Sequence, residues 1–121
     1  MMMTKEERSK MGRRNRNRGA RAERELANLF RERYGIECKR GQVFNHQSDL
    51  VGLPFIHPEV KRVEKLNVYE AMHQAIVEAG IRQDGLPAVF HRKDRTDWLV
   101  TMRLEDWVKF YQFALENDII I

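Results

Sequence analysis

Apolar residues recur at helical spacing in three stretches of the chain. Residues 19–34 place four apolar side chains on one face of a helix, and Gly35 follows at the usual position of a helix C-terminus. These side chains are Ala22, Leu26, Leu29 and Phe30. The same spacing predicts helices over residues 65–80, with Asn67 as the N-cap, and over residues 104–115.

Short apolar runs between these helices predict five strands. They cover residues 36–40, 49–51, 56–62, 86–90 and 98–102. Residues 52–54 carry a turn signal, so we expect the strands on either side of them to pair as a hairpin. Pro58 has no N–H, so one side of its strand must be an edge, a bulge or the start of the strand. The element order predicts an α/β fold in which helices flank a mixed central β-sheet.

The first 18 residues differ from the rest of the chain. They contain the run GRRNRNRG and almost nothing apolar after Met11, so we expect a disordered basic arm (residues 1–18) before a single domain (residues 19–121). Residues 1–24 hold nine basic and three acidic side chains, a net charge of +6, which leaves −2 for the remainder of a chain of net charge +4. Such an arm is a good phosphate ligand, although a solubilising tail has the same composition.

The length and composition of the chain exclude several kinds of protein and of site. A chain of 121 residues is about one domain, and no run approaches the roughly 18 apolar residues of a membrane span. Cys38 is the only cysteine, which excludes an internal disulfide and a cysteine-based zinc site. We expect a cytoplasmic protein in a reducing setting, with no membrane partner.

The segment from Ser48 to Arg62 carries the candidate chemistry. Side chains two apart in a strand share a face, so Glu59 and Lys61 lie side by side, and the hairpin brings Asp49 to them. Two carboxylates and an ammonium suit phosphodiester hydrolysis with Mg²⁺ held by oxygen ligands. Any half-exposed strand also alternates in this way, which is the competing structural interpretation.

Other polar residues extend this site. Glu23 lies at the edge of the first helix's apolar stripe, where a carboxylate needs a partner or a metal, although a surface acid is the alternative. Gln74 on the second helix has an amide that can orient water, and His46 in the loop before Asp49 is a weaker candidate. We expect the following basic residues to contact DNA phosphates: Arg13, Arg14, Arg16, Arg18, Arg21, Arg40, Arg62, Arg92 and Lys93.

The ordered set of motifs resembles the PD-(D/E)xK nuclease superfamily. The set comprises Gly19-x-x-x-Glu23, Ser48-Asp49, Glu59-Val60-Lys61 and Gln74, and the resemblance covers roughly residues 19–107. The chain looks most like the archaeal Holliday junction resolvases and the small phage endonucleases related to them. It departs from their pattern at Ser48, where proline is usual, and at Pro58, where an apolar strand residue is usual.

The resemblance implies a restriction-endonuclease-like core and a role for each matched residue. Glu23, Asp49 and Glu59, with the carbonyl of Val60, would hold Mg²⁺, for which Mn²⁺ is a substitute. Lys61 would be the catalytic lysine and Gln74 an auxiliary catalytic residue. The resemblance also implies a homodimer that cuts branched DNA, within the bacterial host if the protein comes from a phage.

These features predict a metal-dependent DNA endonuclease, most closely a phage-type Holliday junction resolvase. Two closely placed carboxylates repel one another, so without metal we expect one of them to be partly protonated. The alternatives are a nuclease of the same fold that acts on duplex ends, nicks, flaps or RNA, and a DNA-binding module without catalysis.

Overall fold

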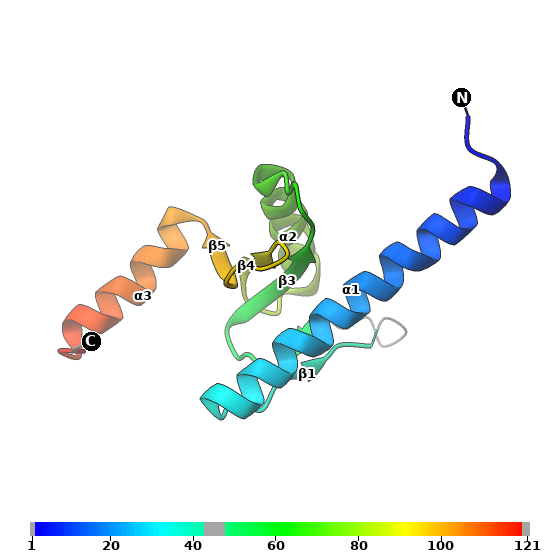
Figure 1. The fold of residues 1–121 in the computed structure, drawn as a ribbon. Coiled ribbons are helices and arrows are strands. Elements are labelled where there is room, and N and C mark those ends of the chain that lie inside the picture. The colour runs from blue at the N-terminus through cyan, green and yellow to red at the C-terminus, as the bar shows by residue number, and fades with distance from the viewer. Residues whose placement is uncertain (1, 43–47, 120–121) are drawn as a thin grey trace.

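The computed structural model describes residues 2–42 and 48–119, except for the side chains of residues 15–17. It contains three helices and five strands in the described part of the chain (Figure 1). In chain order they are α1 (Lys5–Tyr34), β1 (Lys39–Arg40), β2 (Leu50–Val51), β3 (Ile56–Arg62), α2 (Val68–Arg82), β4 (Leu86–Arg92), β5 (Leu99–Met102) and α3 (Leu104–Glu116). The architecture is α/β, as predicted.

The main sheet has three strands in the order β3-β4-β5. β3 and β4 run parallel, with Glu59 opposite Val89, and β5 is antiparallel to β4. α1 packs on one face of this sheet, where Leu26 and Val60 belong to the larger core cluster. α2 packs on the other face, where Ala75 contacts Val89. The sheet is therefore mixed and lies between two helices.

The predicted hairpin between residues 49–51 and 56–62 is wrong, because β2 pairs with β1 instead. Gly52 has a φ of +103°, and a Cβ there would lie 2.0 Å from the carbonyl oxygen of Glu37. This close approach holds the end of β2 against the chain that leads into β1. β3 is left as an edge strand of the main sheet, which agrees with the expectation from Pro58.

α1 begins at Lys5 rather than at Gly19, so residues 5–18 of the predicted arm are helical in this structure. Thr4 and Glu7 form a capping box at the N-terminus, and Gly35 closes the other end in the left-handed region, with φ +65°. Once residues 19–34 are packed, each added helical residue costs only propagation and not nucleation. Lys, Arg and Glu propagate a helix well.

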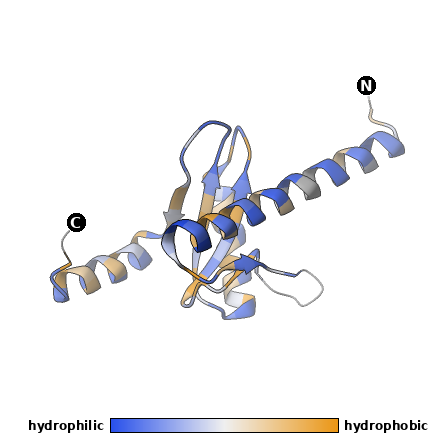
Figure 2. Cartoon of the chain, turned by 60° about the horizontal axis from the view of Figure 1, so that its bottom comes forward, coloured by the Kyte–Doolittle hydropathy of each residue, from blue (hydrophilic) through white to orange (hydrophobic). Residues whose placement is uncertain are grey.

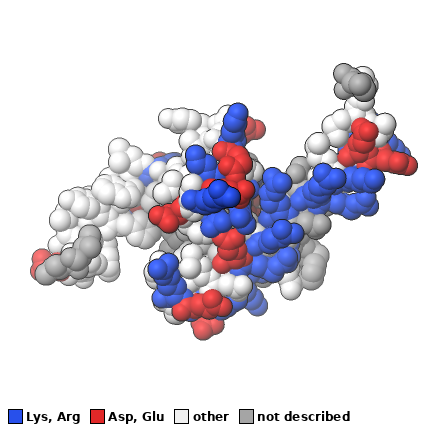
Figure 3. Space-filling view, in the orientation of Figure 1, with Lys and Arg blue, Asp and Glu red and all other residues white. Residues whose placement is uncertain are grey.

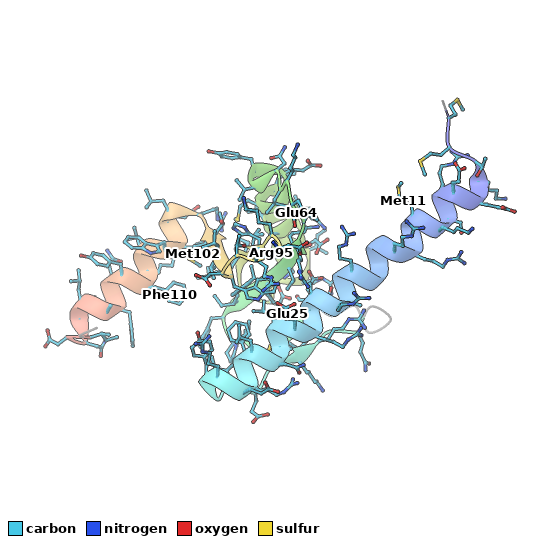
Figure 4. The ribbon with its side chains drawn as sticks, in the orientation of Figure 1. Met11, Glu25, Glu64, Arg95, Met102 and Phe110 are labelled. Carbon is cyan, nitrogen blue, oxygen red and sulfur yellow. The ribbon has the colours of Figure 1, made fainter. Side chains whose placement is uncertain are left out.

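The first half of α1 and the whole of α3 extend from the body in opposite directions (Figure 1). Figure 2 shows that this half of α1 is mostly hydrophilic, whereas α3 carries many hydrophobic residues. Met11 projects from α1 away from the body (Figure 4). α3 keeps several large apolar side chains exposed, namely Leu104, Trp107, Phe110, Tyr111, Phe113 and Leu115.

Candidate active site

Asp49 is fixed beside the edge strand β3. Its Oδ2 accepts a hydrogen bond from the backbone N–H of Val60 at 2.8 Å. In an extended strand the N–H groups of residues two apart point the same way, so Val60 and Pro58 face this edge together. Pro58 has no N–H and so needs no acceptor at this edge. Asp49 accepts the hydrogen bond from the N–H of Val60. The carboxylate is thereby held next to Glu59-Val60-Lys61 without a β2–β3 hairpin.

A cavity of about 280 Å³ opens at this edge, between α1 and β3. Four of the five predicted catalytic residues line it: Glu23, Asp49, Glu59 and Lys61. The other lining residues are Arg18, Gly19, Val60, Arg62 and Val63. Three carboxylates, one ammonium and two guanidinium groups thus converge on one space.

Glu59 is the most perturbed acid of the site. Its residue surface is 4% exposed, and its pKa is raised to about 7, first by burial and then by the neighbouring Asp49 carboxylate. Lys61, with Nζ 3.5 Å from Glu59 Oε1, opposes the rise. Glu59 Oε2 has no hydrogen-bond partner in the described part of the chain. This confirms the expectation that one acid is partly protonated when no cation is present.

The other two acids are shifted in the same direction. Burial raises the pKa of Asp49, against the lowering effect of the Val60 N–H. Burial also raises the pKa of Glu23, although the hydrogen bond from Arg40, at 2.7 Å, opposes the rise. A bound cation would lower the pKa of each carboxylate, because it favours the ionised form. The oxygens of Glu23, Asp49, Glu59 and the Val60 carbonyl are of the kind that a hard divalent ion such as Mg²⁺ prefers. Among the described residues, however, the acids and histidine whose ligand atoms lie within 4.8 Å of one another are His57, Glu59 and Glu78.

Gln74 and His46 are not placed in this cavity. Gln74 is exposed on α2, and its amide donates to Glu78 Oε1 at 3.5 Å. Gln74 is absent from the cavity lining, so the structure does not bring it to the carboxylates. His46 lies outside the described residues.

Sequence reasoning missed a buried network behind Glu59. His57 is fully buried, and its Nδ1 lies 2.7 Å from Asp84 Oδ1 and 3.1 Å from Ser48 Oγ. Ser48 also donates to the Asp84 carboxylate. The two-residue spacing from His57 to Glu59 could have revealed that the two share a face of β3. Asp84 follows α2, and nothing in the local sequence pattern points to its role.

The predicted phosphate ligands fall into two groups. Arg13, Arg14, Arg18, Arg21 and Lys93 are exposed, and Figure 3 shows Lys and Arg gathered along α1 and over the body beside it. Arg40, Arg62 and Arg92 are engaged in ion pairs with acids of α1. The side chain of Arg16 lies outside the described part of the structure. Apart from Lys93, the exposed members of this set therefore lie on α1.

A larger cavity, of about 760 Å³, lies elsewhere, next to Glu25, Arg92 and Trp98. Two of its charged residues are paired with each other: Arg92 Nη1 lies 3.1 Å from Glu25 Oε1, and the Trp98 N–H donates to the same oxygen at 3.2 Å. Satisfied charges of this kind make poor cation ligands. The smaller cavity, with an unpartnered carboxylate oxygen, is the better candidate for chemistry.

No protein-family profile, curated protein or solved structure matches this chain. Among the described residues, no helix is both long enough and apolar enough to cross a membrane.

Proposed function

We propose that this protein is a metal-dependent DNA endonuclease, most closely of the Holliday junction resolvase type. The observation that supports this proposal is the convergence of Glu23, Asp49, Glu59 and Lys61 on one cavity, with Glu59 buried and short of a partner. A structural ion-pair network would satisfy its carboxylate oxygens. A site that binds a divalent cation leaves oxygens available for it.

Each residue then has a role in phosphodiester hydrolysis. Glu23, Asp49, Glu59 and the Val60 carbonyl would hold Mg²⁺, or Mn²⁺ in its place, and this ion would supply charge stabilisation at the scissile phosphate. Lys61 is 30% exposed, so its ammonium can reach both Glu59 and a phosphate oxygen in the cavity. Arg18 and Arg62 line the same cavity and hold the adjacent phosphates. Gln74 does not line this cavity, and its amide contacts Glu78 instead.

The first half of α1 is the proposed backbone-binding element. Its described arginines (Arg8, Arg13, Arg14 and Arg18) are exposed and carry no apolar companion face, which suits contact with DNA phosphates rather than with a membrane. Phosphate contacts fix position without reading base sequence, so the proposed specificity is for DNA shape. The proposed substrate is branched DNA, and the proposed setting is the cytoplasm, in the bacterial host for a phage protein.

We also propose a homodimer that forms through α3. The exposed apolar residues on this helix continue onto β5, where Leu99 and Val100 are more than half exposed. Trp107 and Tyr111 stack on each other at 5.1 Å between ring centroids, which forms a flat aromatic surface on α3. A second copy that covers this surface would place two active sites on one assembly, as the symmetric cutting of a junction requires.

A cleavage assay tests the enzymatic proposal. Labelled four-way junction, flap and linear duplex are each offered with Mg²⁺ and with chelator, to the wild type, to Glu59→Ala and to Glu32→Ala. Glu32 is an exposed acid on α1 outside the cavity and serves as the matched control. The expected result is paired nicks on the junction, lost with chelator and in Glu59→Ala but kept in Glu32→Ala.

Other outcomes would revise the proposal. Metal-dependent cutting of the flap, the duplex or RNA in preference to the junction would keep the active site and change the substrate. Junction binding without any cutting in Mg²⁺ or Mn²⁺ would replace the enzyme with a binding module.

A further inference from the structure

His57 is held in one tautomer by its neighbours. The side chain is fully buried on β3, and Nδ1 lies 2.7 Å from Asp84 Oδ1. An ionised carboxylate can only accept a hydrogen bond, so Nδ1 carries the hydrogen. The lone pair of the neutral ring is then on Nε2, the nitrogen that faces Glu78 of α2.

Nε2 has no hydrogen-bond partner within the described residues, although it is buried. Glu78 Oε2, the nearest acid, is 3.8 Å away, which is too long for a hydrogen bond. Glu59 Oε2 is also buried and unpartnered on the same face of β3. One ligand atom from each of His57, Glu59 and Glu78 lies within 4.8 Å of the other two. His57 Nε2 and Glu59 Oε2, both buried and without a hydrogen-bond partner in the described part of the chain, thus lie close to the half-buried carboxylate of Glu78.

We propose that His57, Glu59 and Glu78 form a second cation site, selective for a divalent transition metal such as Mn²⁺ or Zn²⁺. This inference rests on the proposed function only through Glu59, which the two sites share. The second site adds His57 and Glu78 to Glu59, whereas Glu23 and Asp49 belong only to the first site.

The chemistry of the ligands sets the selectivity. Imidazole nitrogen suits Mn²⁺, Zn²⁺ and similar ions, whereas Mg²⁺ favours oxygen ligands and retains its waters. The Asp84–His57 contact also matches a common arrangement in metalloproteins, in which a carboxylate holds the far nitrogen of a metal-binding histidine. Ser48 donates a hydrogen bond to the Asp84 carboxylate, so the His57 ring is already oriented in the absence of an ion.

Spectroscopy of Mn²⁺ bound to the full chain tests the proposal, with Mg²⁺ in large excess to fill the oxygen-only site. Pulsed electron paramagnetic resonance detects ¹⁴N from a coordinated imidazole, and it does not depend on enzymatic activity. The wild type is expected to show a nitrogen-coupled Mn²⁺ signal. Glu78→Gln should weaken this Mn²⁺ site at least tenfold and reduce the signal accordingly, because the variant lacks one of the three protein ligands.

Two further variants separate the possible causes. His73→Gln removes an exposed histidine from the same helix and should keep the signal. Asp49→Asn should also keep it, while Mg²⁺ affinity falls, so that failure of the proposed Mg²⁺ site is distinguishable from failure of this one. Absence of a nitrogen signal in the wild type, or an unchanged signal in Glu78→Gln, would overturn the proposal.

Discussion

At the scale of a single residue, the neighbours of Glu59 act on its pKa in opposite directions. Its position on β3 buries it beside Asp49, which favours the neutral acid, while Lys61 favours the anion. The balance leaves its pKa at about 7, so that its charge is sensitive to anything that binds nearby. A carboxylate poised in this way responds to a cation more strongly than an exposed acid does.

The stability of the metal-free protein should depend on this residue between pH 4.5 and about 7. The folded state binds the Glu59 proton more tightly than the unfolded state, so the stabilisation is complete below pH 4.5 and is lost as the pH rises through about 7. The free energy of unfolding should fall by up to about 3 kcal/mol across this range. Urea denaturation in chelator at pH 5 and pH 8 measures it.

Glu59→Gln should remove most of this pH dependence, because glutamine does not titrate. A slope of equal size in the variant and the wild type would assign the pH dependence to other groups. Asp49 and Glu23 also have raised pKa values, so a small slope of the same sign should remain.

Lys61→Ala should reduce single-turnover cleavage at least about a hundredfold, since the variant lacks the ammonium that we propose to contact the reacting phosphate. DNA affinity, measured by fluorescence anisotropy, should stay within a few-fold. Lys65→Ala, an exposed lysine in the following loop, is the control and should cut normally. Parallel losses of binding and cleavage in Lys61→Ala would count against a catalytic role.

At the scale of helices and strands, some boundaries can be predicted from local sequence patterns alone. β3 has the predicted bounds, and α2 has the predicted N-cap at Asn67, because strand alternation and capping are local properties. α2 continues past Gly80 to Arg82, since Gln83 adopts the left-handed conformation that ends the helix. Local patterns placed Asp49 beside Glu59, but for the wrong reason: a side-chain hydrogen bond to Val60, not a hairpin, joins them.

The parts that could not be predicted depend on distant contacts. The pairing of β2 with β1 is a choice between two similar short strands, and the close approach of Gly52 to Glu37 favours β1. The helical state of residues 5–18 depends on a nucleus that lies further along α1. Glu78 and Asp84 reach His57 from α2 and from the segment after it, so their roles appear only in three dimensions.

Gly52→Ala should destabilise the protein by more than about 2 kcal/mol, because its Cβ would overlap the Glu37 carbonyl and its φ of +103° is unfavourable for alanine. Thermal unfolding followed by circular dichroism measures the loss. Gly80→Ala is the control, since a Cβ there meets nothing within 4 Å. Unchanged stability in Gly52→Ala would mean that β1 and β2 do not approach in this way.

The double variant Arg13→Gln/Arg14→Gln should flatten the salt dependence of DNA binding. Removing one phosphate-binding side chain changes the log–log slope by about 0.9, so removing both should change it by about 1.8. Arg33→Gln, an exposed arginine at the opposite end of α1, should leave the slope unchanged. An unaltered slope in the double variant would show that this half of α1 does not contact DNA.

The whole molecule is asymmetric, with a basic helix at one end and an apolar helix at the other. Figure 3 shows the contrast between the charged α1 and the largely uncharged α3. The exposed apolar side chains of α3 are too many to be favourable in water, and a partner that covers them would bury a continuous surface. The proposed dimer therefore leaves α1 of each copy free to contact DNA.

Phe110→Glu/Phe113→Glu should convert the dimer to a monomer, because each new charge would have to be buried in the interface. Sedimentation velocity at micromolar concentration measures the oligomeric state. Tyr69→Glu, at an 86% exposed aromatic on α2, is the control and should remain dimeric. A wild type that sediments as a monomer, alone and with junction DNA, would reject the α3 interface.

The continuity of α1 has one more consequence. A helix of 30 residues is about 45 Å long, and Arg13 lies about 15 Å along its axis from Glu23. Because the helix is rigid, a phosphate bound at Arg13 would lie at a fixed distance from the phosphodiester bond that is cut beside Glu23. The cut should therefore fall at a constant offset from the point where α1 engages the DNA. One alanine inserted after Asn17 would shift that offset by about 1.5 Å and rotate the basic segment by about 100°, whereas a flexible tether would not register the change.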